Sequence, residues 1–365
     1  MAIDTTVRPI SDVRCGIRAE TTFGVASDST GADGTAYRQI PMVQVTKPTF
    51  NISRESRLLS GRGLVRHEDD SVVNARGGTV TMPFDFIATP TLLAQHLTLV
   101  TQEHSQAGSY VHTTQVGGEG TQLPQIGGTI TSSMPHSVNL AYYPQSSGGT
   151  RITGAVVSDL SIAGDYGTNG GFLNCSGNYF SGFSNPLSTA TSLETDFTVG
   201  NWTSVENGTF FNMGNMSTKT LTSDGSAKDL ILKSFNINIA NGVNRVGWNS
   251  NGDAEVYAFP EYIVTGDITV KMDANFDYSS GANVIQDFLD GDTLTLTLKI
   301  GDGTISTVGE VNFIVNCQYT GDPAQDISEN GIFHTLSFEG VNTGTSSDEE
   351  AFKSVLFSSQ QISEW

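Results

Sequence analysis

Apolar and polar residues alternate strictly in several short segments of the chain, and two of these segments can be overlaid without a gap. The first covers residues 79–86 and the second covers residues 267–274. A period of two places one set of side chains in a core and the other set in water. The pattern therefore predicts two strands, whose polar positions include Thr79, Thr81 and Asp85 in the first and Asp267, Thr269 and Asp273 in the second.

The elements around these strands repeat in the same order, at a spacing of about 185 residues. A short strand is predicted before each one, at 49–52 and 234–237, and a short helix after each one. Helix-start signals, Thr89-Pro90 in the first half and Ser279-Ser280 in the second, precede a single apolar stripe at 92–97 and at 284–289. Three more strands follow in each half, at 138–142, 154–164 and 171–180 in the first and at 294–298, 309–321 and 332–338 in the second. The sequence thus uses one supersecondary unit twice.

This repeat predicts the organisation of the chain. Gly is abundant, at 40 residues, only 15% of the chain is charged, and long helical heptads are absent. We therefore expect an all-β fold with short flanking helices, made of two tandem units joined by a Ser/Thr/Gly-rich linker. The predicted segments are an N-terminal arm at 1–46, the units at 47–185 and 230–342, a linker or surface excursion at 186–229, and a C-terminal arm with a capped helix at 343–365.

The chain is strongly acidic, with a formal net charge of −20. Because affinity for nucleic acids comes mainly from neutralising phosphates, most of this surface should repel DNA. The charge is uneven, however: 10 of the 18 basic residues lie in the first 76 positions, where nine acidic residues nearly balance them. The basic residues of the N-terminal quarter could therefore bind an acidic surface of a neighbouring protein.

Half of these cations, Arg76 among them, belong to one polar segment between the first two strands of the repeat. One interpretation is a solvated hairpin or loop, and the other is a docking loop for an acidic surface, where mixed charges set register and orientation. A nucleic-acid loop fits less well, because acidic residues lie inside the cluster and no aromatic residue is interleaved for base stacking. The residues of this segment are Arg54, Arg57, Arg62, Arg66, Glu68, Asp69 and Asp70.

A search for catalytic or metal-binding motifs favours a structural protein without a cofactor. His96 has no second ligand at helical spacing, and we expect a structural histidine. His104 and His112 lack further ligands, and the alternation from Asn249 to Glu255 lacks the carboxylates that calcium needs. The three cysteines are widely spaced and fit neither a disulfide framework nor a zinc site. No secretory signal or membrane span is predicted, which indicates a cytosolic origin.

Several short stretches resemble the tail tube proteins of long-tailed bacteriophages, in the subgroup with a duplicated tube fold. They are the segment GIRAETTFG at 16–24, the arginine-bearing segment followed by Gly77-Gly78 and the strand-to-helix step, and the run at 133–164. The second half repeats the plan. The resemblance implies a virion structural protein, located in the tail and assembled in the cytoplasm of the host bacterium, with other tail proteins as partners and no contact with a membrane.

The resemblance also implies how the chain would assemble. Each unit would be a tail-tube-type β-sandwich with one flanking helix. The inner sheets of neighbouring copies would form a continuous barrel around a wide lumen. Two units per chain would give a trimeric ring with pseudo-sixfold symmetry, and a hexameric ring is the alternative. Rings would stack through the long arm, whose arginines would meet an acidic rim. The polar strand positions named above would be candidates for the lumen, through which phage DNA would pass without sticking.

Two other readings stay open at this point. One is a different virion component, such as a baseplate hub, a tail terminator or a decoration protein, which would differ from a tube protein in its copy number per virion. The other is a carbohydrate-binding or hydrolytic β-sandwich. The latter predicts clustered exposed aromatic residues, whereas Trp202, Trp248 and Trp365 lie far apart in the sequence.

Overall fold

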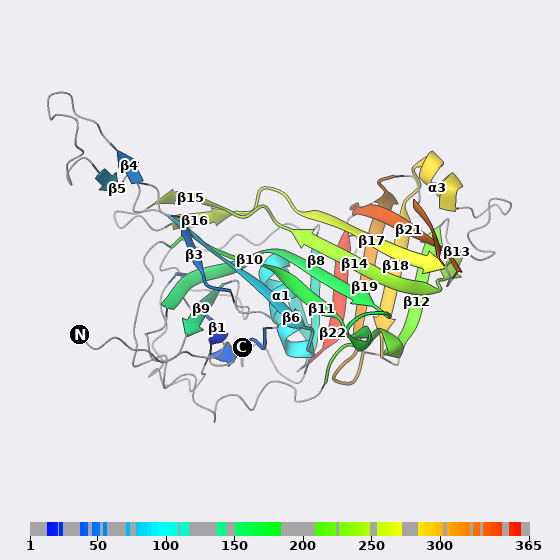
Figure 1. Ribbon diagram of the computed structural model, residues 1–365, viewed down its shortest axis with the longest axis horizontal. Coiled ribbons are helices and arrows are strands. Elements are labelled where there is room, and N and C mark those ends of the chain that lie inside the picture. The colour runs from blue at the N-terminus through cyan, green and yellow to red at the C-terminus, as the bar shows by residue number, and fades with distance from the viewer. Residues whose placement is uncertain are drawn as a thin grey trace.

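The computed structural model describes most of the two halves of the chain (Figure 1). The described residues are 13–20, 22–24, 37–42, 46–51, 54–56, 71–73, 78–108, 110–116, 137–143, 150–183, 209–223, 226–248, 254–271, 284–301, 305–321, 324–328, 331–344 and 350–358.

The fold is mostly β, as the alternation predicts, and its largest feature is an antiparallel sheet that runs through both halves of the chain. We call it the inner sheet. Its middle is a seam where β10 of the first half pairs with β14 of the second, with Asp165 opposite Ser234 and Leu160 opposite Ile239. In spatial order the strands are β3 (Thr49–Asn51), β6 (Thr79–Ile87), β11 (Asn174–Ser181), β10 (Thr150–Asp165), β14 (Leu232–Ala240), β17 (Ile263–Lys271), β21 (Gly331–Gly340) and β20 (Ala324–Ser328).

A second antiparallel sheet, the outer sheet, packs on the apolar face of the first and also joins the two halves. The joining strand is β22 (Phe352–Phe357), which pairs with β19 on one side and with β8 on the other. In spatial order the strands are β13 (Ser226–Asp229), β12 (Met216–Ser223), β18 (Leu294–Ile300), β19 (Val311–Tyr319), β22, β8 (Val111–Val116) and β7 (His104–Ala107).

The remaining strands complete the first half. The long strand β10 bends: its first part pairs with β9 (Val138–Tyr143), and its second part belongs to the inner sheet. A register shift between Ile152 and Ala155 marks the bend, where Gly154 adopts a φ of +61° that favours glycine. Beyond β9 lie β1 (Arg14–Ala19) and β2 (Arg38–Gln39). Two separate ribbons are β4 (Arg54–Ser56) with β5 (Ser71–Val73), and β15 (Asn244–Trp248) with β16 (Ala254–Ala258).

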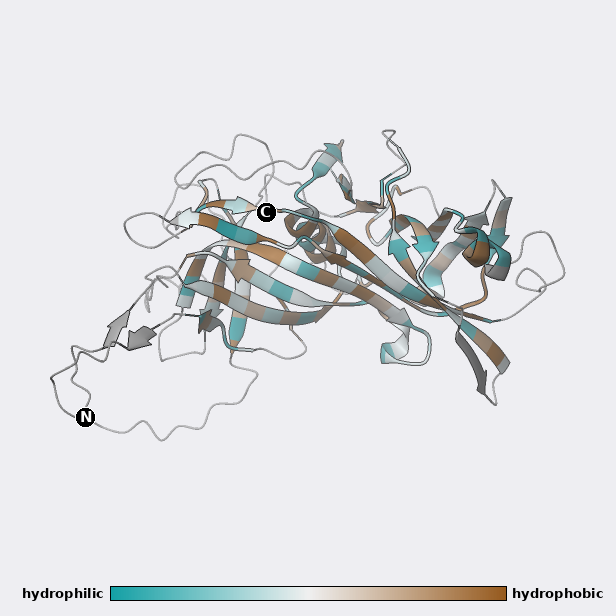
Figure 2. Ribbon diagram, turned by 90° about the horizontal axis from the view of Figure 1, so that it is seen from above, coloured by the Kyte–Doolittle hydropathy of each residue, from teal (hydrophilic) through white to brown (hydrophobic). Residues whose placement is uncertain are grey.

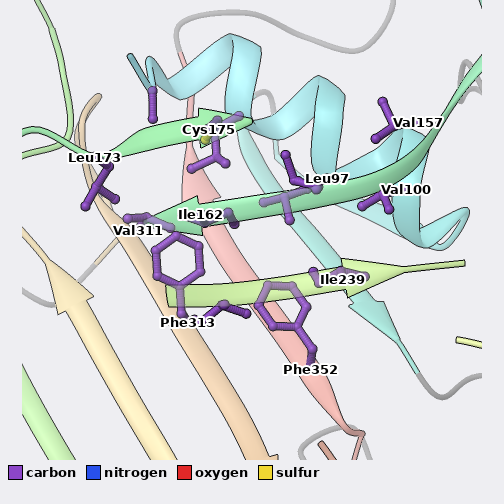
Figure 3. Packing of buried hydrophobic residues seen from close by; sticks show 14 of the residues in the cluster. Leu97, Val100, Val157, Ile162, Leu173, Cys175, Ile239, Val311, Phe313 and Phe352 are labelled. Atoms are coloured by element: carbon purple, nitrogen blue, oxygen red, sulfur yellow. The ribbon is translucent and has the colours of Figure 1, made fainter. Parts of the chain in front are cut away.

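A single main hydrophobic core fills the space between the sheets. It contains side chains of both halves, such as Leu97 and Ile162 from the first and Phe313 and Phe352 from the second (Figure 3). Along the strands, hydrophobic and hydrophilic residues alternate as expected for faces that look into a core and away from it (Figure 2). Burial of this apolar surface from both halves at once makes the chain one packing unit.

Helix α1 (Pro90–Thr101) lies inside this core, and all of its residues are buried. The sequence predicts only one apolar stripe, so the complete burial is a correction to that expectation. Two of its threonines are satisfied within the helix: the hydroxyl of Thr98 donates to the carbonyl of Ala94, and that of Thr101 donates to the carbonyl of Leu97. Internal hydrogen bonds of this kind let a threonine be buried without a partner elsewhere.

The two halves share an order of strand pairings, although common descent from one duplicated unit stays a prediction. In the first half β1 pairs with β2 and β9, β6 pairs with β3 and β11, and β10 pairs with β9 and β11. In the second half β12 pairs with β13 and β18, β17 pairs with β14 and β21, and β19 pairs with β18 and β21. By this order β12 corresponds to β1, β14 corresponds to β3, and β19 corresponds to β10.

Three expectations about individual segments are wrong. The described end of the predicted linker, 209–223 and 226–229, contributes β12 and β13 to the outer sheet. The predicted C-terminal helix is the strand β22, whose backbone is hydrogen-bonded on both sides. In α3 (Val284–Asp290), Leu289 is 69% exposed and does not join an apolar stripe, whereas Asp287 is buried and accepts a hydrogen bond from Ser223.

Candidate functional site

One face of the inner sheet is polar across both halves of the chain. The sequence-predicted Thr79, Thr81 and Asp85 on β6 and Asp267 and Thr269 on β17 lie on this face, separated by β11, β10 and β14. The register aligns their side chains, because each paired position across these antiparallel strands projects to the same side. Asp273, the last of the predicted positions, lies outside the described residues.

Sequence reasoning predicts the strands between these two but does not name the polar positions that they add to this face. Following the register from Asp85 gives Ser176, then Ser161, then Asn238 and Thr265, all on the same face. The period-two alternation is present in these strands as well, so the signal for their polar positions exists in the sequence. The other polar residues found on this face are Asn174, Asn178, Asp159, Asp165, Ser234, Asn236, Thr335, Ser337 and Glu339.

Hydrogen bonds between neighbouring strands organise this polar face. The side-chain amide of Asn174 donates to Oδ1 of Asp85 over 2.7 Å, and that of Asn178 donates to Oδ1 of Asp159 over 3.0 Å. At the seam between the halves, the hydroxyl of Ser161 donates to Oδ1 of Asn236 over 2.8 Å. These bonds link polar side chains of neighbouring strands across the face.

The charge on this face is mostly negative among the described residues. Its carboxylates are those of Asp85, Asp159, Asp165, Asp267 and Glu339. Burial raises the pKa of Asp267 above its usual value, and a hydrogen bond with the Asn236 side chain opposes this effect.

Two lysines lie at the end of this face, on the side of the second half. Lys271 is paired with Phe333, and Nζ of Lys233 lies 5.0 Å from the centroid of the Phe333 ring. A cation at this distance over an aromatic face is attracted by the ring. The middle of the face therefore carries acidic, amide and hydroxyl groups without a described lysine or arginine among them.

The predicted docking arm is described only in part. Arg54 lies in β4, which pairs with β5 as a ribbon that projects from the end of the inner sheet where β6 begins (Figure 1). Arg57, Arg62, Arg66, Glu68, Asp69 and Asp70 lie outside the described residues.

The other residues considered for chemistry have structural roles where they are described. His96 is buried, with Nδ1 2.7 Å from the carbonyl oxygen of Leu92 and Nε2 2.5 Å from the hydroxyl of Tyr179. Nε2 of His104 lies 3.0 Å from Nδ1 of His112, and Nε2 of His112 lies 2.9 Å from the hydroxyl of Ser358. Within the described ranges, no group of three or more His, Cys, Asp or Glu residues is placed to hold a metal ion.

The cysteines are buried free thiols. Desolvation by burial raises the pKa values of Cys15, Cys175 and Cys317 above the ordinary thiol value. A thiol whose ionisation is disfavoured in this way is a weak nucleophile. Of the alternating residues that resemble a calcium loop, Asn249, Asn251 and Asp253 lie outside the described residues, and Glu255 is exposed on β16.

Comparisons with known proteins agree with the resemblance seen in the sequence. A family model described as phage tail tube protein matches residues 10–340. The comparison with curated proteins found no match. In the parts of the chain that are described, no helix combines the length and apolar character needed to cross a membrane. Because the family match extends over most of the chain and includes both halves of the inner sheet, this chain belongs to the phage tail tube protein family, whose members are structural components of the virion tail and assemble with other tail proteins into a tube.

Proposed function

We propose that this protein forms rings that stack into the tail tube, with the polar face of the inner sheet lining the lumen. The observation that carries the proposal is the continuity of this sheet: one acidic and amide-rich face extends across both halves, from β6 to β21. A sheet with one polar and one core face is suited to curve around a water-filled channel.

The edges of the inner sheet support ring closure. One edge is β3 and the other is β20, and each pairs with a single strand among the described residues. Unpaired edges are templates for pairing with another chain, and closure into a barrel removes them. Within the chain, two such edges are already paired: antiparallel hydrogen bonding between β10 and β14 joins the two halves. Because β14 corresponds to β3, and β19 with β20 corresponds to β10, the same kind of seam can join one chain to the next.

This arrangement gives a preferred stoichiometry. Each chain supplies two similar units, so three chains supply six units in a ring with pseudo-sixfold symmetry. A ring of six chains is the alternative, in which the barrel would be about twice as large. We further propose that assembly takes place in the cytoplasm of the host bacterium, where the buried thiols stay reduced.

An acidic lumen accounts for passage of the genome. DNA carries a high density of negative charge, and the middle of this wall, where the described residues carry carboxylates and include no lysine or arginine, offers it no phosphate ligand. The side-chain amides and hydroxyls keep the wall hydrated. The role of Asp85, Asp267 and their neighbours is thus to keep the DNA from binding as it moves through the tube.

The arginine-bearing segment between β3 and β6 is proposed to connect successive rings. Its charges are attracted to an acidic surface, and the ribbon of β4 and β5 leads away from the sheets (Figure 1). Reversal of Arg57 and Arg66 to Glu should leave single rings intact and prevent them from stacking. The matched control is Lys219→Glu with Lys299→Glu, which makes the same charge change on β12 and β18 of the outer sheet.

The experiment is electron microscopy of the purified protein combined with native mass measurement. Hollow rings or tubes with a ring mass of three chains support the proposal in full, and a mass of six chains corrects the stoichiometry. Normal tubes from the Arg57→Glu, Arg66→Glu variant would contradict the docking role of the arm. If only monomers form, even in the presence of the other tail proteins, the proposed assembly is wrong.

A further inference from the structure

Three aromatic side chains are exposed together at one end of the inner sheet, and we call them the aromatic patch. They are Tyr166, which is 43% exposed, Phe172, which is 37% exposed, and Phe210, which is 39% exposed. Tyr166 and Phe172 lie in the turn from β10 to β11, and Phe210 precedes the short helix η5 (Met213–Asn215). These residues come from two segments of chain that are distant in sequence.

Hydrogen bonds and ring contacts fix the patch in place. The rings of Phe172 and Phe210 meet edge to face, with their centroids 5.8 Å apart. Phe172 and Asn212 form an isolated β-bridge, and the side-chain amide of Asn212 donates to the carbonyl of Gly170. The hydroxyl of Tyr166 donates to the carbonyl of Met213 over 2.7 Å. The aromatic surfaces are therefore held ready for a partner without a large loss of side-chain entropy.

The core does not need these three side chains. Their sequence neighbours Leu173 and Phe211 are fully buried and fill the core at this end of the sheet. Exposed apolar side chains that gather on one surface mark interaction sites in soluble proteins, whereas single ones need no explanation. Aromatic residues are also the ones that contribute most at the centres of interfaces.

The patch and the ribbon of β4 and β5, the described part of the arginine-bearing arm, lie at opposite ends of the inner sheet (Figure 1). The arm leads into the start of β6, where Val80 is paired with Ser181 at the end of β11. The patch adjoins the other end of the same strands, where Ile87 is paired with Asn174. In Figure 1 the ribbon of β4 and β5 projects from the end of the sheet away from the turn after β10. A contact between opposite ends of identical molecules repeats without closing and so builds a fibre.

We propose that the aromatic patch is the receptor for the arginine-bearing arm of a second copy of this chain in the next ring. Arginine stacks on aromatic faces and pairs with carboxylates at the same time. In this proposal the carboxylate of Asp165, next to Tyr166 in the chain, takes the pairing role. The nearby cation of Lys233 is directed to the ring of Phe333, at 5.0 Å from its centroid. This inference rests on the proposed stacking of rings and names the surface that receives the arm.

The first test uses the full chain with Phe172→Ala and Phe210→Ala. The control is Tyr110→Ala with Leu289→Ala, which removes exposed apolar groups from the turn before β8 and from α3. We expect rings of unchanged mass from both variants and a tenfold or greater loss of mean tube length from the patch variant alone. Tubes of normal length from the patch variant would overturn the receptor assignment while leaving the proposed tube function intact.

The second test does not depend on removing the patch. A photo-reactive benzoylphenylalanine replaces Phe210 in the full chain, and the cross-linked peptides in assembled tubes are identified by mass spectrometry. Cross-links to residues 54–76 of another copy support the assignment. Cross-links only to other segments, or none in tubes that otherwise form, overturn it. Failure of this protein and of the unmodified chain to form rings at all would instead count against the proposed function.

Discussion

The hydroxyl of Tyr179 on β11 donates a hydrogen bond of 2.5 Å to Nε2 of His96 on α1, in the interior of the core. The direction follows from the other ring nitrogen. Nδ1 lies 2.7 Å from the carbonyl oxygen of Leu92, which can only accept, so Nδ1 carries the proton. The ring also lies against Phe84 and Phe86, with centroid distances of 4.8 and 4.6 Å. This bond ties the buried helix to the inner sheet.

Tyr179→Phe should destabilise the protein without changing its fold. The substitution leaves Nε2 of His96 buried without a donor, which costs about 1–3 kcal/mol. Urea unfolding of the unassembled protein, followed by circular dichroism, measures the loss. Tyr110→Phe is the control, because Tyr110 is exposed. Equal unfolding free energies for Tyr179→Phe and the unchanged protein would show that the bond contributes nothing net.

Two buried groups should give the stability opposite dependences on pH. Desolvation lowers the pKa of His96 from 6.5 to about 4, and its hydrogen bond with the Leu92 carbonyl partly opposes this shift. The neutral, buried imidazole therefore contributes fully to the free energy of unfolding above pH 6.5, and this contribution is lost as the pH falls to about 4. Desolvation raises the pKa of Glu20 to about 7, against hydrogen bonds from Gly154, Ser137 and Gly24. The protonated carboxyl group of Glu20 therefore contributes fully to the free energy of unfolding below pH 4.5, and this contribution is lost as the pH rises to about 7.

Glu20→Gln separates the two contributions. The variant keeps the loss of stability that His96 causes on acidification, but it lacks the opposing gain from Glu20. We expect its unfolding free energy to rise more steeply than that of the unchanged protein between pH 4.5 and 7, by an amount on the order of 3 kcal/mol over this range. Urea titrations at several pH values measure the slopes, with Glu255→Gln on the exposed side of β16 as the control. Parallel profiles for all three proteins would rule out the assigned role of Glu20.

Gly266→Ala should be strongly destabilising, because two neighbouring strands approach this glycine closely. A Cβ at Gly266 would lie 2.3 Å from the carbonyl oxygen of Asn236 and 2.5 Å from the ring of Phe338. Forcing a methyl group into such a space costs roughly 1–3 kcal/mol or more. Gly321→Ala is the matched control, since nothing lies within 4 Å of its added Cβ and its φ is not left-handed. Thermal unfolding of the two variants checks this prediction. The melting temperature of Gly266→Ala should be much lower than that of Gly321→Ala.

Replacing the acids of the polar face by lysine should make DNA stick inside the tube. Asp85→Lys, Asp159→Lys and Asp267→Lys convert a wall that repels phosphate into one that binds it. We expect tubes to assemble, phage infectivity to fall at least tenfold, and purified tubes to retain DNA in a salt-dependent way.

The matched control for this prediction makes the same change in charge on exposed acids elsewhere, with Asp229→Lys, Glu255→Lys and Glu261→Lys. If the control binds DNA as strongly and infects as poorly, net charge accounts for the effect and the polar face has no special role. Replacement of the same three acids of the face by Asn should give an intermediate result, since it removes repulsion without adding a ligand for phosphate.

Much of this fold follows from the alternation of polar and apolar residues. The strands β6 and β17 and the polar positions Thr79 and Asp267 are predicted directly, because a period of two has only one way to bury its apolar side. Their presence on one continuous face is not predicted. It depends on β11, β10 and β14 lying between them in a particular order, and the order of strands in a sheet arises from long-range pairing that local patterns do not encode.

The C-terminal strand shows why some local signals mislead. The residues at 347–350 resemble a helix cap, and Phe352, Val355 and Leu356 have helical spacing. The same segment also has Phe352, Ser354 and Leu356 at a spacing of two, and all three are buried in β22. Pairing with β19 and β8 decides between the two patterns, since it satisfies the backbone on both sides.

The position of β22 between β19 and β8 has a consequence for the time at which the protein becomes competent to assemble. During synthesis β22 emerges after every other described strand, yet it is the strand that joins the outer-sheet segments of the two halves. A nascent chain on the ribosome can form the inner sheet and expose its edges, but its outer layer stays divided into two pieces. A chain truncated before β22 lacks the strand that joins the two halves of the outer sheet, so its halves are held together less rigidly than in a chain that contains β22.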